Sequence, residues 1–174
     1  AYEISECLAG SEMCIRDRYL TADKMISGSQ AEVWVTYNDT GDRFCYARLI
    51  NLSAKCKINK KKVSILGRTG KVTRAFSWEG EGSAKLYYCD STQRQKVKEF
   101  ALSGKMFSMD IEVYNNDASS CMTEQGVILK NCILDDIILA AVDIDTEELT
   151  EEINFSFDDF EITKTFEERT LEVK

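Results

Sequence analysis

The residue types that usually carry catalysis are scarce in this chain. Histidine is absent from its 174 residues, so neither a Ser-His-Asp nor a Cys-His arrangement can be assembled. The seven cysteines include no Cys-X-X-Cys pair, which disfavours a tetrahedral zinc site. An odd number of scattered cysteines without a secretion signal is typical of free thiols in a reducing cytoplasm. We therefore predict no catalytic residue.

Two short motifs have the composition of ligand-binding loops. Asp143-Ile-Asp145-Thr-Glu147-Glu148 has the alternating acids with which a calcium loop begins, but it lacks the glycine and the bidentate glutamate at the required spacing. Glu79-Gly-Glu-Gly82 is a two-glycine turn with no following Lys-Ser or Lys-Thr to hold a phosphate. We interpret the first as a solvated acidic turn, and we predict no metal, no cofactor and no enzymatic activity.

Charge is strongly separated along the chain. Between Arg43 and Trp78 there are ten Lys or Arg residues and no acid, whereas Asp135 to Lys174 holds fourteen acids and three bases. Complementary charged surfaces fix partner and register, and head-to-tail contacts between copies build rings and filaments. The alternative is that both segments are solvated faces whose signs happen to differ.

The length and composition are those of one globular domain, with 44% hydrophobic and 10% aromatic residues. No apolar run approaches the roughly 20 residues of a membrane helix. Residues 1–18 show no period of 2 or 3.6, and we expect them to be a non-native or disordered extension; an ordinary flexible arm is the alternative. We expect the domain to span residues 19–166 and a C-terminal tail to span 167–174.

The domain is predicted to consist mainly of strands. Alternating apolar and polar residues, separated by turn-forming clusters such as Asn38 to Asp42, are typical of antiparallel strands. Leu49 and Ile50 are out of step, which predicts a bulge. The predicted strands are 31–37, 43–58, 63–66, 83–89, 107–113, 126–134, 136–144 and 153–157 continuing towards 162, with a polar tip at 59–62 and a basic loop at 67–76.

One helix is predicted at about residues 91–103. Asp90 or Ser91 can cap its first turn, and Gly104 stands where a left-handed residue ends a helix. Val97, Phe100 and Ala101 share one face, which we expect to lie against a sheet. The predicted class is therefore mainly β: an antiparallel β-sandwich or barrel with one flanking α-helix.

Four segments carry a resemblance to a known family. They are Met25-Ile-Ser-Gly-Ser29 leading into Ala31-Glu-Val-Trp-Val35, then Val63-Ser-Ile-Leu-Gly-Arg68, Ala84-Lys-Leu-Tyr-Tyr88, and the run from Val142 to Glu161. In order and spacing they resemble the myophage tail tube protein family, typified by the tube subunit of a Bacillus defective prophage. The resemblance covers roughly Lys24 to Phe166. The first eighteen residues and the longer hairpin at 38–42 depart from the family pattern.

The resemblance implies a structural role. Members of the family form six-membered rings that stack into the inner tube of a contractile tail, with the sheets of neighbouring subunits joined around the lumen. The implied partners are further copies of the chain and the sheath, tape-measure and baseplate proteins, with DNA only as passing cargo and no membrane. The implied location is the tail tube of a virion, and the host cytoplasm during assembly.

Two alternatives stay open. The stretch from Lys55 to Arg74, with Phe76 and Trp78 for base stacking, has the composition of a single-strand binding module. The sequence pI of about 4.7 argues against it, because binding domains are usually basic overall. The tube of a contractile bacteriocin or injection system is the other alternative, since it uses the same kind of subunit.

A ring-stacking contact is expected between the densest segments of opposite charge. We expect the basic loop, with the polar tip before it, to meet the acidic segment of a neighbouring subunit. The candidate interface residues are Lys60, Lys61, Lys62, Arg68, Lys71, Arg74, Glu147, Glu148, Glu151 and Glu152.

Overall fold

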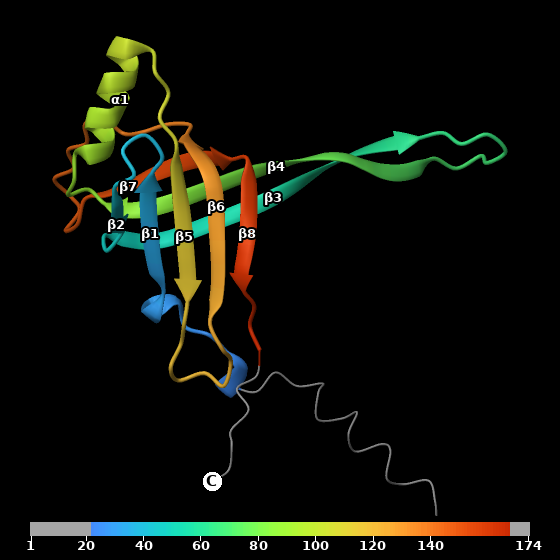
Figure 1. Cartoon of the computed structure of the whole chain (residues 1–174), viewed down its shortest axis with the longest axis horizontal. Helices are drawn as coiled ribbons and strands as arrows, with labels where there is room; N and C mark the ends of the chain where they lie inside the picture. Colours follow the sequence, from blue (N-terminus) through green and yellow to red (C-terminus); the bar gives the residue numbers. More distant parts are fainter. Residues whose placement is uncertain (1–21, 168–174) are drawn as a thin grey trace, which may run out of the picture.

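The computed structural model describes residues 22–167, and Figure 1 shows their arrangement. The predicted extension at 1–18 lies outside the described residues, as does the predicted tail beyond its first residue. The described elements are η2 (Ala22–Lys24), η3 (Gly28–Gln30), β1 (Glu32–Tyr37), β2 (Arg43–Cys45), β3 (Leu49–Val63), β4 (Val72–Tyr87), α1 (Thr92–Ser103), β5 (Met109–Asn115), β6 (Gln125–Leu134), β7 (Thr150–Phe157) and β8 (Asp159–Lys164).

Strand β6 joins two layers of antiparallel strands. The pairing order is β2-β1-β5-β6-β7-β4-β3, and β8 also pairs with β6. Residues 126–130 of β6 pair with β8, whereas Ile133 and Leu134 pair with β7. The sheet therefore turns over at β6, and β3, β4 and β7 cross behind the other strands (Figure 1). The predicted class, an antiparallel β-sandwich or barrel with one flanking helix, is confirmed; the sheet does not close on itself.

The core follows from the two-residue alternation of the strands. In β1, Val33, Val35 and Tyr37 are buried while the residues between them are more exposed. In β7 the inward positions are Glu151, Ile153, Phe155 and Phe157. A Cβ atom added at Gly82 would come within 2.3 Å of the Phe155 ring, so glycine is what lets this ring lie against β4.

The segment from Arg43 to Tyr87 differs from the prediction. The predicted strand 43–58 is interrupted after Cys45, and the expected bulge is present as a register shift between Leu49 and Asn51. The predicted tip at 59–62 is wrong, because β3 continues through it to Val63. The predicted strand 63–66 and loop 67–76 are also wrong, since the connection is 64–71 and β4 begins at Val72. Few side chains here are buried, so the alternation that marks a strand is weak.

Two further predictions need correction. The predicted strand 136–144 is wrong, because residues 135–149 connect β6 to β7 without a strand. The predicted last strand is two strands that meet at Asp158. The predicted turns at Gly41 and Gly104 are confirmed, with φ of 74° and 70°.

The helix is held to the sheet by polar contacts more than by apolar ones. Phe100 and Ala101, which were expected to face the sheet, are exposed, and Val97 is the member of that set that packs on the core. Gln93 is buried and donates a hydrogen bond to the hydroxyl of Tyr46. The amphipathic prediction was wrong because polar side chains occupy part of the inner face.

Ion pairs complete this attachment. The guanidinium of Arg94 in α1 pairs with the carboxylate of Glu151 in β7, and the two side chains are 12% and 1% exposed. Lys96 lies 2.8 Å from Asp39, and this hydrogen bond lowers the pKa of the Asp39 carboxyl while it raises the pKa of the Lys96 amine. A buried charge without its partner is strongly destabilising, so the Arg94–Glu151 pair fixes the helix to β7.

Replacement of Glu151 by glutamine tests this attachment. Glu151→Gln leaves the Arg94 charge buried without a counter-charge, so we expect the free energy of unfolding to fall by about 3–5 kcal/mol. Glu152→Gln is the matched control, since Glu152 is exposed one residue further on, and we expect a change within about 0.5 kcal/mol. Urea denaturation followed by circular dichroism measures both. Equal stability of the two variants would contradict the role of the pair.

Candidate assembly interface

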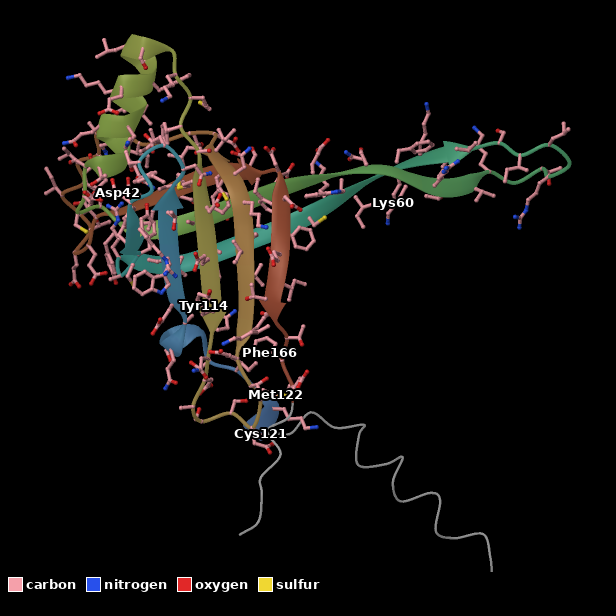
Figure 2. All side chains as sticks on the ribbon, viewed as in Figure 1. Asp42, Lys60, Tyr114, Cys121, Met122 and Phe166 are labelled. Carbon is pink, nitrogen blue, oxygen red and sulfur yellow. The ribbon has the colours of Figure 1, made fainter. Side chains whose placement is uncertain are left out.

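The β3–β4 hairpin projects far beyond the rest of the domain. Strand β7 accompanies β4 only as far as the pair Gly80–Phe157. Beyond it, residues 57–79 form a two-stranded ribbon with no third strand among the described residues. Figure 1 shows the ribbon leaving the body at the right, and Figure 2 shows the side chain of Lys60 on it. We call residues 57–79 the ribbon.

The inner part of the ribbon presents two different faces. On one face the amine of Lys57 lies 3.2 Å from Glu81 and 3.9 Å from Glu79. On the other, Ile58 is opposite Trp78, and both stay exposed. The Trp78 ring lies 5.7 Å from the Phe160 ring of β8 and 6.4 Å from the Phe157 ring, measured between centroids. The tryptophan therefore ties the base of the ribbon to β7 and β8.

The six basic candidate residues all lie on the outer part of the ribbon. They are exposed, and none of them forms an ion pair within residues 22–167. The Arg74 guanidinium lies 5.6 Å from the centre of the exposed Phe76 ring. The structure places these residues on three successive segments, with Lys60, Lys61 and Lys62 in β3, Arg68 and Lys71 in the connection, and Arg74 in β4.

The acidic candidates lie at the other end of the molecule. Glu147 and Glu148 are exposed in the 135–149 connection, and Glu152 is exposed in β7 opposite Lys85. Glu151 does not belong to this surface, because its carboxylate is buried against Arg94. Figure 1 shows this connection, in orange, beside α1 and opposite the tip of the ribbon along the longest axis. The two charged sets can therefore meet only between copies of the chain.

Sequence reasoning missed the apolar members of these two surfaces. Leu66 in the tip of the ribbon is fully exposed, and Val142 and Ile144 in the 135–149 connection are nearly so. The sequence signal was weak, because Leu66 follows Ile65 and Val142 ends the apolar run that begins at Ile137, so both resemble residues of a buried strand. The interface was instead predicted from the neighbouring charged residues alone.

The described residues offer little chemistry elsewhere. No group of three or more His, Cys, Asp or Glu side chains within 22–167 is placed to hold a metal ion. In the same range no helix is long and apolar enough to cross a membrane. An open hollow of about 550 Å³ lies between β1 and β3, lined by residues that include Val33, Leu52 and Val113. Buried Cys132 has a pKa raised by desolvation to about 12, so its thiol is not a nucleophile at neutral pH.

Two bacterial proteins are similar to this chain in sequence. The protein XkdM of the phage-like element PBSX of Bacillus subtilis (strain 168) is 25% identical over 143 residues, which cover 82% of this chain and 93% of XkdM. The uncharacterized protein YqbM of the same strain is 26% identical over 143 residues, with the same shares of both chains.

The fold is also that of a solved tube component. A chain of the sheath/tube terminator of the extracellular contractile injection system PVC, in its extended state, superposes with a TM-score of 0.64. The match covers 83% of this chain and 100% of that chain at 9% identity, so it shows the fold alone. The pattern that defines the family "Phage tail tube protein" matches residues 18–164, which confirms the resemblance seen in the sequence. The chain therefore belongs to the phage tail tube protein family and is a tail tube subunit.

Proposed function

We propose that this protein is the repeating subunit of the inner tube of a contractile phage tail or phage-like particle. Its copies form six-membered rings, the rings stack into a tube, and DNA passes through the lumen. The sheath, tape-measure and baseplate proteins are its other partners in the virion, and assembly takes place in the host cytoplasm. The tube of a contractile bacteriocin or injection system would use the same surfaces for another cargo.

The observation that carries this proposal is the unsupported ribbon. A two-stranded hairpin is at best marginally stable alone in water, and exposed strand edges invite pairing with other chains. Residues 57–79 have no third strand within the described chain and expose Ile58, Phe76 and Trp78. A tube supplies what the single subunit lacks, because neighbouring copies can cover both the edges and the apolar face.

The separated charges support stacking through the ends of the subunit. We propose that the basic residues of the ribbon meet Glu147, Glu148 and Glu152 of a subunit in the next ring. Glu151 is not part of this proposed contact, because its carboxylate is buried in an ion pair with Arg94 of the same subunit. Exposed pairs contribute about 0–1 kcal/mol each, but a ring repeats every pair around its circumference, so their sum can set the register.

The rival function, binding of nucleic acid by the ribbon, has less support. Trp78, one of the two aromatic residues that would stack on bases, already contacts the rings of Phe157 and Phe160. Phe76 and the basic residues remain exposed, so the ribbon keeps a positive surface. The net charge of −8 opposes general attraction to phosphates.

The first test is assembly. We expect the purified full-length chain to form rings or tubes, because tube contacts would cover the ribbon. Negative-stain electron microscopy and light scattering over a range of protein concentrations measure this. A monodisperse monomer at every protein and salt concentration would argue strongly against the proposal.

Charge reversal tests the stacking contact. Lys71→Glu with Arg74→Glu should shorten or abolish tubes while circular dichroism stays unchanged, because like charges then face the acidic connection. Lys98→Glu with Lys105→Glu makes the same change in net charge at exposed positions in or just after α1 and should leave tubes intact. Glu147→Lys with Glu148→Lys should restore growth of the reversed subunit. Unchanged tube length and salt sensitivity in the first double variant would disprove this contact.

DNA binding separates the conduit from the rival. A conduit should hold DNA weakly and without a saturable site, because tight phosphate contacts would arrest the cargo. Fluorescence anisotropy with single- and double-stranded oligonucleotides at 150 mM salt measures the affinity. Tight, saturable binding that is lost in the Lys71/Arg74 double variant would favour the nucleic-acid module.

A further inference from the structure

The turn at the tip of the ribbon exposes an aliphatic side chain to solvent. The amide of Arg68 donates a hydrogen bond to the carbonyl of Ile65 at 3.2 Å, and Gly67 between them has φ of 81°. This is a type II turn, in which a glycine takes the positive φ and the residue before it stands at the corner. That residue is Leu66, which is 103% exposed. The connection at the end of the ribbon therefore carries an exposed leucine, and Arg68 and Lys71 lie in the same connection.

The 135–149 connection at the opposite end has the complementary arrangement. The amide of Asp145 bonds the Asp143 carboxylate at 3.0 Å, and the turn thus closed holds Ile144 outward, 94% exposed. Val142 is 90% exposed beside it, and the surrounding charges are acidic. The start of the connection is anchored, since Arg94 donates to the carbonyl of Ile138 at 2.9 Å and Tyr88 donates to that of Leu139 at 3.3 Å.

We propose that Leu66 of one subunit docks on Val142 and Ile144 of a second copy, and that this apolar contact is the anchor of the stacking interface. The inference rests on the proposed tube function and adds the residues that drive the contact. Single exposed apolar residues are common. Here, however, exposed apolar side chains lie at both ends of one molecule, with basic residues near them on the ribbon and acidic residues near them on the 135–149 connection. Interfaces of this kind concentrate their energy in a few central side chains, while the surrounding contacts exclude water and select the partner.

A second copy of the chain is the partner that fits both surfaces. The two surfaces are complementary in charge and apolar character, yet the length of the molecule keeps them apart within one subunit (Figure 1). A contact between two different surfaces of the same chain is head-to-tail, so it repeats without limit along a filament or closes into a ring.

Neutral substitutions separate the apolar anchor from the charges. We expect Leu66→Ser and Ile144→Ser in the full-length chain to raise the lowest concentration that supports tube growth about tenfold or more, as loss of a central hot spot does. Leu102→Ser is the matched control at an 80% exposed position in α1, and we expect no change. The defect should persist in 1 M NaCl, where the screening length is about 3 Å, whereas the effect of charge reversal should shrink.

Cross-linking tests the contact without requiring tubes. A mixture of Leu66→Cys and Ile144→Cys full-length variants, treated with a short bismaleimide, should give dimers severalfold above either variant alone. A mixture of Leu66→Cys with Leu102→Cys reports the background from native thiols. Normal tubes from Leu66→Ser with no specific cross-link would overturn the anchor and leave the tube function standing. Specific dimers from a chain that never forms tubes would support the contact and overturn the tube, and failure of both would overturn both.

Discussion

The ladder between β3 and β4 is the interaction on which the rest of the structure depends. It runs from the pair Leu49–Leu86 in the core to the pair Val63–Val72 near the tip, so one set of backbone hydrogen bonds belongs to both the domain and its projection. At the inner end Leu86 is fully buried and the ladder is covered by β7. At the outer end no third strand of the described chain pairs with this ladder. Folding of the domain therefore positions an element that the domain alone does not stabilise.

The sequence was informative where one face of a strand is buried, and misleading where neither face is. Val33, Val35 and Tyr37 alternate with exposed residues, and the strand that they form was predicted within one residue. The ribbon gives no such signal, because both its faces meet solvent in a single subunit, and its lysines suggested a loop. The opposite error was made for the run from Ile137 to Val142, where a strand was predicted and none is present. Its apolar residues indicated a strand, but most of them are exposed in an irregular connection. Both errors arise where side chains are not buried within the subunit.

The acidic segment shows why charge patterns alone could not define the site. Glu151 and Glu152 are adjacent, and the sequence treats them alike. The alternation of β7 sends the first into the interior, where Arg94 is its counter-charge, and leaves the second on the surface opposite Lys85. One glutamate therefore attaches the helix, while the other is free for a neighbouring subunit. Only the register of the strand distinguishes them, and the register depends on contacts that sequence reasoning had not placed.

Because the two ends of one subunit are complementary, a single contact between two subunits has to be weak. Any two free subunits can begin a filament when they meet, so a strong single contact would produce irregular chains before rings are complete. Exposed charge pairs contribute about 0–1 kcal/mol each, and one small apolar anchor adds a contact of limited area. Such a contact is weak between two subunits and becomes strong when several form at once, because each contact already made raises the effective concentration for the next. The exposed charges and the single leucine at the tip of the ribbon therefore suit an interface that is stable between complete rings and dissociates between isolated subunits.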